Sequence, residues 1–374
     1  MSGESSREKS KRYSAIKTRL FVADIFLSVV AIGAFQFILS RPVSRFAFGL
    51  HENFYLACLI YLAAFLAFVY MVGLPLNFYG SFLVERDFGL SRQDLGGWLW
   101  DEVKSVLLSF FLYAACIEGF YLILRNFPIY WWLIAAAVWI FFSVFLTRIM
   151  PVVLIPLFYR YSPIEDDSLK KRIMSLAKKT HIKLTQVCQI DFSRKTSKAN
   201  AALVGLGSTR KVILADTLVN GFEPDEVEAV VAHELGHQKY LHIWQLLAFS
   251  SLVTFAGFFL LSRVAGRIVA VTGASGLSDI YILPLLVLLM LGFGLVLLPV
   301  QNWFSRLLEK QADSFTLRIT GNPDSFIRVM SKLADMNLAE IDPSFLKKIF
   351  MYNHPPINER IEMARRQGSS SINR

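Results

Sequence analysis

Six long apolar segments constrain this chain more than any other feature of its sequence. They cover residues 20–39, 55–77, 103–125, 130–158, 242–263 and 280–303. About 20 apolar residues span a bilayer as a helix, and only a helix or a closed barrel satisfies every backbone hydrogen bond in lipid. We therefore predict a multi-pass α-helical membrane protein with about six transmembrane helices. The composition agrees, because 54% of the residues are hydrophobic and only 18% are charged.

The first apolar segment is expected to be a retained helix, because it lacks a small-residue cleavage site and continues beyond a short signal-peptide core. Residues 1–19 before it carry six Lys or Arg against two Glu, which favours a cytoplasmic N-terminus. With six spans, the C-terminus and the polar stretches then share that side. We expect a basic segment (1–19), a membrane domain with four spans (20–159) and a domain that includes the last two spans (160–374).

We interpret the net charge of +10 mainly as the excess of basic residues that sets the membrane topology, and we expect anionic lipid head groups as its partners. Nucleic acid is not an expected partner, because no basic stripe is interleaved with aromatic residues. The three cysteines, at positions 58, 116 and 188, are too few and too scattered for a disulfide framework or a metal site.

The polar stretch after the fourth apolar segment predicts a small α+β domain. Leu169, Ile173 and Leu176 share one face of an expected helix, and "VCQID", "NAALVGL" and "KVILAD" are typical of short strands. Pro224 is expected to begin the helix that carries "HELGH", and another helix should begin at Asn322-Pro323.

The chemistry of the chain centres on "HELGH". His233 and His237 stand four residues apart, so both imidazoles project from one helical face toward a single zinc ion, with Glu234 beside them. Such a pattern also occurs by chance on ordinary helices, but three of the six histidines fall within 233–242. His242 lies about 140° round a continuous helix from His237, so we expect it to mark the membrane interface and not to share the metal.

A catalytic zinc takes three protein ligands and leaves the fourth position for water, so a third ligand is required. Directly after the last apolar segment, "SRLLEKQADSF" places Glu309 and Asp313 four residues apart. One carboxylate could bind the metal while the other fixes the tautomer of a histidine. Exposed helices often carry such a pair without function, but the pair shares a membrane face with "HELGH", which favours a joint site.

From about residue 70 to about residue 365, these motifs resemble the integral-membrane type I CAAX prenyl endopeptidases and their prokaryotic relatives, which are zinc metalloproteases. The resemblance implies a small α+β zincin-like metalloprotease domain. The motifs that carry it, in the order of the family, are "LPLNFYGSFLVERDFGLSRQDLGGWLWDEVK", "IPLFYRYSPI", "TSKANAALVGLG", "VILADTL", "HELGHQKYLH", "EKQAD" and "NHPPINERI".

The resemblance assigns His233, His237 and Glu309 as ligands of one zinc ion per chain. It makes Glu234 the general base for the attacking water, and Asp313 the residue that orients a ligand histidine.

Four further residues receive less specific roles from the resemblance. Asn200 and Ala201 match the strand that holds the substrate backbone beside the metal. His354 and Arg360 match a pair near the catalytic centre that stabilises the oxyanion or binds substrate carbonyls. The plain alternatives are a strand end for Asn200, a turn residue for His354 and a solvated helix charge for Arg360.

The chain also departs from the family pattern. Ala202 stands where better-known members have an aromatic residue, which implies a wider cleft. The additional membrane helix and the long polar insertion of the eukaryotic enzymes are missing, so the chain looks more like a prokaryotic member in a bacterial or archaeal cell membrane. Prokaryotes generally lack prenylated CAAX proteins, which weakens the inference of a prenylated substrate.

The expected function is a membrane zinc endopeptidase that cuts membrane-tethered or membrane-proximal polypeptides, with prenylated CAAX-type proteins as one option. The second reading is a quality-control protease for misfolded membrane proteins with no lipid requirement. The third is a non-catalytic receptor or scaffold with a structural zinc. Glu234 argues against the third reading, because a structural site takes a fourth protein ligand and has no use for a base.

Overall fold

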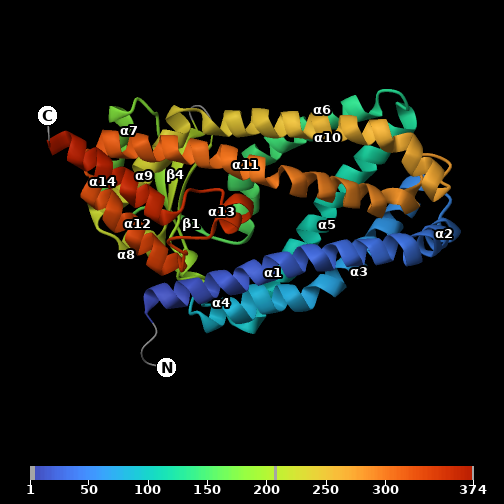
Figure 1. The fold of residues 1–374 in the computed structure, drawn as a ribbon, viewed down its shortest axis with the longest axis horizontal. Helices are drawn as coiled ribbons and strands as arrows, with labels where there is room; N and C mark the ends of the chain where they lie inside the picture. Colours follow the sequence, from blue (N-terminus) through green and yellow to red (C-terminus); the bar gives the residue numbers. More distant parts are fainter. Residues whose placement is uncertain (1–4, 206–208, 373–374) are drawn as a thin grey trace.

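The computed structural model describes residues 5–205 and 209–372. Long helices run side by side along the molecule, and a smaller mixed domain with the sheet lies at one end of them (Figure 1). Six helical stretches of the described chain are long and apolar enough to cross a membrane, which confirms the predicted architecture. These stretches are α1 (Ser6–Ala34) with η1 (Phe35–Leu39) and α2 (Ser40–Leu50); α3 (Phe54–Asn77) with η2 (Phe78–Leu83) and α4 (Val84–Asp87); α5 (Leu95–Asn126); α6 (Trp131–Ile149) with η3 (Met150–Leu154) and η4 (Ile155–Leu157); α10 (His242–Thr272); and η7 (Ile280–Ile282) with α11 (Leu283–Thr320).

Two of these helices extend well beyond their apolar parts. The basic segment expected before the first span is the start of α1, where Ser5 and Glu8 form a capping box. At the other end of the chain, α11 continues past the apolar residues as far as Thr320 and carries Glu309 with it. Hydropathy detects only the part of a helix that lies in lipid, whereas backbone hydrogen bonding continues into water.

The mixed domain contains a four-stranded sheet in the order β1-β2-β4-β3. Strands β2 and β4 are parallel, while β1 and β3 pair antiparallel at the two edges. Three strands lie where the sequence predicts them, and the end of the second predicted strand, at 206, falls outside the described residues. The short β1 was not predicted. The strands are β1 (Tyr161–Pro163), β2 (Gln186–Ile190), β3 (Ala201–Val204) and β4 (Lys211–Ala215).

Helices surround this sheet and build the core of the mixed domain. Leu169, Ile173 and Leu176 are buried, as their spacing predicts, and Asn322 caps α12 by accepting a hydrogen bond from the Ser325 amide. The elements of this part are α7 (Asp167–Lys179), η5 (Phe192–Arg194), α8 (Asp216–Gly221), α9 (Pro224–Lys239), α12 (Pro323–Asn337), α13 (Phe345–Met351) and α14 (Ile357–Ile372).

Glu85 joins the membrane helices to the mixed domain. Its carboxylate accepts a hydrogen bond from the Tyr13 hydroxyl (2.6 Å) and forms ion pairs with Lys17 (3.1 Å) and Lys198 (2.8 Å). Tyr13 and Lys17 belong to α1, Glu85 to α4, and Lys198 to the segment that enters β3. These contacts hold the strand β3 close to the ends of the first two membrane-spanning stretches.

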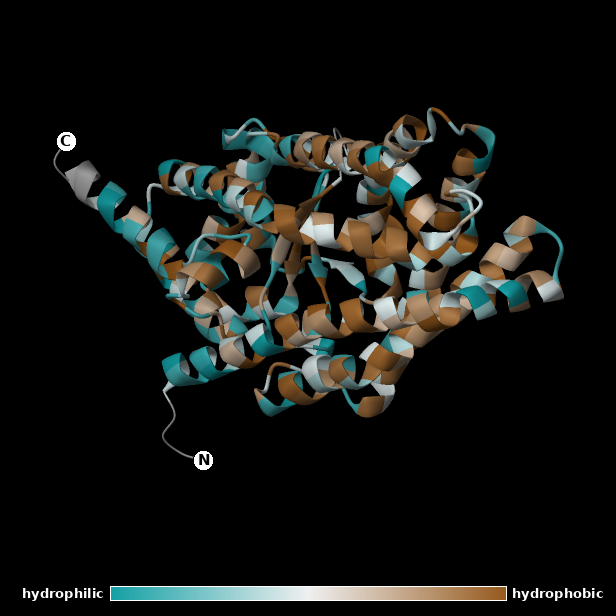
Figure 2. Ribbon diagram, turned by 45° about the vertical axis from the view of Figure 1, so that its right-hand side comes forward, coloured by the Kyte–Doolittle hydropathy of each residue, from teal (hydrophilic) through white to brown (hydrophobic). Residues whose placement is uncertain are grey.

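Apolar residues dominate the long helices, whereas hydrophilic residues gather on the mixed domain and at the helix ends (Figure 2). Large apolar side chains on the spans are exposed, as Phe26 (70% exposed), Phe141 (72%) and Val296 (75%) show. Such exposure would be costly in water and is expected of helices surrounded by lipid.

Candidate metal centre

Helix α9 carries the "HELGH" residues and is firmly held at its start. Pro224 occupies its first turn, and Glu223 and Glu226 form a capping box there. Glu226 is fully buried and its carboxylate lies 2.6 Å from the Lys332 ammonium of α12. This anchoring fixes the rotation of α9, which turns His233 toward α11.

Gly236 lets α9 approach α11 closely enough for ligands from both helices to meet. A Cβ atom at Gly236 would lie 3.1 Å from the Cα atom of Ala312 and 3.2 Å from the Phe315 ring. Any side chain at this position would therefore push the two helices apart.

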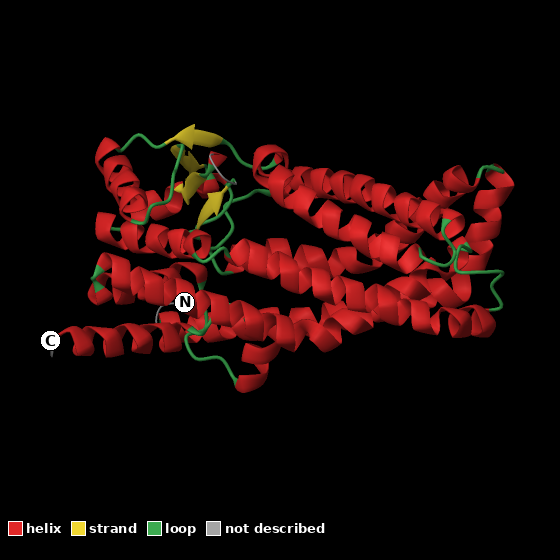
Figure 3. Cartoon of the chain, turned by 90° about the horizontal axis from the view of Figure 1, so that it is seen from above, coloured by secondary structure: helices red, strands yellow, loops and turns green. Residues whose placement is uncertain are grey.

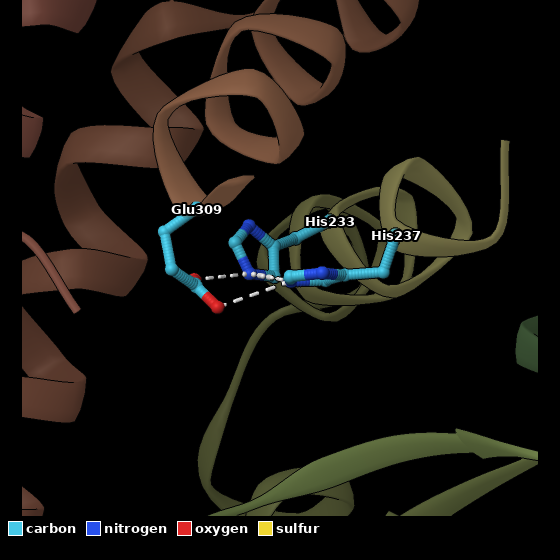
Figure 4. A group of neighbouring side chains, drawn as sticks. All are labelled: His233, His237 and Glu309. Atoms are coloured by element: carbon cyan, nitrogen blue, oxygen red, sulfur yellow. Dashed lines mark hydrogen bonds and ion pairs between the residues drawn. The ribbon is translucent and has the colours of Figure 1, made fainter. Parts of the chain in front are cut away.

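His233, His237 and Glu309 converge between the two helices (Figure 4). The two Nε2 atoms are 3.0 Å apart, and the Glu309 carboxylate oxygens lie 3.1 Å from Nε2 of His233 and 3.3 Å from Nε2 of His237. Zinc bonds of about 2.0–2.1 Å at tetrahedral angles place ligand atoms about 3.3 Å apart. The three donors thus have the chemistry and the spacing of three corners of a tetrahedral zinc site.

Asp313 lies behind His233, on the side away from the other two donors. Its Oδ1 atom is 2.9 Å from Nδ1 of His233, and the side chain of Asp313 is fully buried. Burial by itself lowers the pKa of the His233 imidazole, but Asp313 and Glu309 raise that pKa to about 10. The two carboxylates thus make the site favourable for a cation.

Arg360 was expected near the catalytic centre, and its guanidinium pairs with Asp313, which contacts His233. It donates Nε–H to Oδ2 at 2.8 Å and Nη2–H to Oδ1 at 2.5 Å, in a bidentate pair. Burial opposes the charge, yet Asp313 raises the pKa of Arg360. The expected pair therefore divides: Arg360 contacts Asp313, whereas Nδ1 of His354 lies 2.8 Å from the Glu309 carboxylate with its side chain 53% exposed.

His242 begins the fifth apolar stretch, but it does not lie away from the metal site as the sequence predicted. Its side chain is 1% exposed, its Nδ1 atom lies 2.9 Å from Nδ1 of His237, and its Nε2 atom lies 3.1 Å from Oε1 of Gln311. The prediction assumed one continuous helix, but Leu241 adopts a left-handed conformation (φ 57°) between α9 and α10. This break turns His242 back toward the site. In the sequence, the third histidine of "HELGHQKYLH" was the available signal that His242 belongs to the site, whereas no pattern pointed to Gln311.

Asn200 directly precedes β3 and Ala201 begins it, and β3 is one of the two edge strands of the sheet. The Asn200 carbonyl accepts a hydrogen bond from the Ala215 amide of β4 at 2.9 Å, so its backbone belongs to the sheet. Both residues border a mainly apolar cavity of about 400 Å³, which Ala202 also lines. Its other walls come from the sheet and from the membrane side, including Leu108 of α5 and Leu154 of η3.

Comparisons with known proteins agree with this site. Residues 163–367 match the profile of peptidase family M48, and residues 3–160 match a CAAX prenyl protease N-terminal family described as having five membrane helices. The first match covers more than half of the chain. The chain belongs to peptidase family M48. It is therefore a multi-pass membrane metallopeptidase of the CAAX prenyl protease type, and its family implies a metal cofactor. In this M48 chain, the range of the N-terminal match holds four of the six apolar stretches.

The relatives of this M48 peptidase come from bacteria and eukaryotes. It is 33% identical to an uncharacterized metalloprotease, YhfN, of Bacillus subtilis, with 79% of this chain and 70% of the relative covered. It is 31% identical to CAAX prenyl protease 1 of Saccharomyces cerevisiae, with 78% and 68% covered. The crystal structure of S. mikatae Ste24p superimposes with a TM-score of 0.86 at 26% identity, covering 96% of this chain and 89% of that one.

Replacing Gly236 by alanine should damage the metal site of this M48 peptidase. The added methyl group meets backbone atoms of Ala312, so we expect about 1–3 kcal/mol of destabilisation and weaker metal binding. Thermal unfolding and metal content of detergent-purified protein measure both effects. Gly292→Ala on α11 is the matched control, because a Cβ there has open space within 4 Å. Equal stability and metal content in the two variants would show that α9 and α11 have room to move apart.

Proposed function

We propose that this chain is a zinc endopeptidase that hydrolyses peptide bonds in membrane-associated polypeptides. The observation that carries the proposal is the convergence of His233, His237 and Glu309, with Glu234 next to His233 on α9. Two membrane-spanning helices bring these residues together, since α10 follows α9 directly and α11 itself carries Glu309. The bilayer thereby helps to fix the two halves of the site relative to each other.

His233, His237 and Glu309 would hold the zinc ion, which would supply a Lewis acid and lower the pKa of a bound water. Glu234 is the proposed general base. It is partly exposed, and no hydrogen bond or ion pair ties its side chain within residues 5–205 and 209–372. Its carboxylate is therefore available to take a proton from water and to pass it to the leaving amine. His354 lies at the open side of Glu309, where its imidazole can donate a hydrogen bond to a substrate carbonyl.

The remaining polar residues orient the ligand histidines. A histidine that presents Nε2 to a metal carries its proton on Nδ1. For His233 the acceptor of that proton is Asp313, which Arg360 keeps ionised. For His237 the acceptor is Nδ1 of His242, and this assignment requires His242 to carry its own proton on Nε2, facing the Gln311 amide oxygen. Each ligand imidazole thus has one acceptor behind it.

His242→Ala should lower zinc affinity by about 10- to 100-fold, because His237 loses the acceptor that fixes its tautomer. Competition with a zinc chelator measures this affinity independently of activity. His242→Asn should restore part of the affinity, because its amide oxygen can occupy the position of Nδ1. Equal affinities in the wild type and the alanine variant would reduce His242 to a packing residue.

A substrate peptide is proposed to pair with the free edge of β3. Backbone pairing at a sheet edge gives affinity without demanding a particular sequence, and the adjacent apolar cavity can accept an apolar side chain. The printed name of the S. cerevisiae relative, CAAX prenyl protease 1, makes prenylated CAAX-type polypeptides one substrate class to test.

Asn200→Ala should leave zinc content intact and lower kcat/KM by about tenfold to a thousandfold, if the side chain orients the substrate or the transition state. A continuous assay with a quenched fluorescent peptide, beside metal analysis, gives both values. Unchanged kinetics would leave Asn200 with a structural role only.

Cleavage of a farnesylated CAAX peptide, compared with the same peptide without lipid, tests the substrate class. A prenyl-dependent enzyme cuts only the lipidated form efficiently. Equal rates would favour the alternative of a quality-control protease for misfolded membrane proteins. No cleavage of any peptide by the zinc-loaded protein would contradict the proposal and favour a receptor or scaffold.

The catalytic domain and both termini are proposed to face the cytoplasm of a bacterial or archaeal cell, on the basis of the basic residues before the first span. Reporter fusions after residue 10 and at the C-terminus should both report the cytoplasm. Reporters on opposite sides would overturn this topology.

A further inference from the structure

The short helix α13 exposes an apolar face at the side of the molecule. Phe345 is 74% exposed, Leu346 67% and Phe350 41%, and these positions fall within an arc of about 140° on a helix. Figure 1 shows α13 in front of the gap between α1 and α11. In Figure 3 the same short helix stands out from the side of the helical bundle. This face is not covered by another element of the described chain.

Polar contacts at its C-terminal end hold α13 against α11. Asn302 donates a hydrogen bond to the Ile349 carbonyl (2.9 Å), and Arg306 donates to the Lys348 carbonyl (2.8 Å). These two α11 residues satisfy carbonyls that the end of a short helix leaves unpaired. These contacts therefore fix the position of α13 on α11.

The neighbouring surface of α11 shows what covers this face. Val296, Val300, Trp303 and Leu307 are 75%, 44%, 54% and 40% exposed, and their spacing of four, three and four residues puts them on one exposed apolar stripe of a helix long and apolar enough to span a membrane. Asn302 and Arg306, which hold α13, flank the last turns of this stripe. Tryptophan is typical of the membrane–water interface. Helix α13 thus lies where α11 leaves the bilayer.

The contacts with α1 place α13 at the same level. Lys347 forms an ion pair with Glu340 at 2.8 Å, and the Ser14 hydroxyl donates to the same carboxylate at 2.6 Å. Ser14 lies in the basic part of α1, just before the first apolar segment. The lysines of α13 are thus on its polar side, at the height of lipid head groups, as in amphipathic helices that lie in the interface.

We propose that α13 is an interfacial anchor: its Phe345–Leu346–Phe350 face inserts into the leaflet that α11 leaves, and this holds the loop that carries His354. The loop begins directly after α13, since Met351 precedes His354 by three positions. His354 reaches Glu309 at 2.8 Å although half of its side chain is exposed, so its position depends on that loop. The lipid contact does not rest on the proposed function, whereas the effect on His354 does.

Photocrosslinking in liposomes tests the lipid contact. A benzophenone amino acid placed at Phe345 or Leu346 of the full-length chain should form lipid adducts that mass spectrometry detects. The same probe at Val296 of α11 is the lipid control, and at Met174 of α7, which is 37% exposed in the mixed domain, it is the water control. If a probe at Phe345 forms no more lipid adducts than the probe at Met174, or if it yields cross-linked dimers of the chain, the proposed anchor is wrong.

The double variant Phe345→Ser, Leu346→Ser tests the effect on His354. We expect normal zinc content and a several-fold loss of cleavage of a membrane-tethered peptide. Phe141→Ser with Phe145→Ser, two exposed positions on α6, is the matched control and should cleave normally. Wild-type rates in the first variant would show that the anchor does not hold His354. If the wild type itself cleaves no peptide, the proposed function fails, while the lipid adducts still decide the anchor.

Discussion

Glu234→Gln is expected to abolish peptide hydrolysis while the protein keeps its metal ion, which we propose to be zinc. The substitution preserves shape and removes the basic oxygen, so the loss should reach the about 10²- to 10⁴-fold that general base catalysis contributes. The metal should stay, because His233, His237 and Glu309 are unchanged. Metal content by atomic emission and single-turnover cleavage of one peptide, on the same purified sample, separate the two effects.

Glu228→Gln is the control for this substitution, because Glu228 lies on the same helix and pairs with Arg172 away from the metal centre. It should turn over normally. If the Glu234→Gln variant also turned over normally, Glu234 would not be the base and the hydrolytic mechanism would have to be abandoned.

Glu309→Ala is expected to lose both zinc and activity. Glu309 is the only donor of the three that comes from α11, and its carboxylate lies within 3.3 Å of both imidazole Nε2 atoms. Without it, two imidazoles and water remain, and such a site binds zinc weakly. The loss in affinity should exceed the about 10- to 100-fold expected when only a residue behind a ligand is removed. Equilibrium dialysis against a zinc buffer measures it.

Lys310→Ala is the neighbouring control, since Lys310 is half exposed and pairs at 3.7 Å with Glu359. It should keep zinc and activity. Full zinc occupancy in the Glu309→Ala variant would mean that the third ligand lies elsewhere and that "EKQAD" has been misassigned. We thus expect Glu234→Gln to keep zinc and Glu309→Ala to lose it, whereas both variants should lose turnover.

Periodicity and hydropathy predicted the elements that depend on neighbouring residues. The six spans follow from local apolarity, and the helix around "HELGH" follows from Pro224 and its flanking carboxylates. The pairs His233 with His237, and Glu309 with Asp313, follow from a spacing of four residues on a helix. Such properties are set within a few turns of the chain, so no tertiary contact is needed to predict them. The joint zinc assignment additionally rested on the resemblance to the family.

Only the tertiary structure decided that His242 stands behind His237 and that Arg360 pairs with Asp313. His242 reaches His237 because the backbone reverses at Leu241, and Arg360 faces Asp313 because α14 packs beside α11. The short β1 forms because β2 pairs with it, and α13 is held in place because α11 residues bind its C-terminal carbonyls. Each of these depends on contacts between segments far apart in sequence or on a single backbone torsion, and a repeating pattern along the chain contains neither.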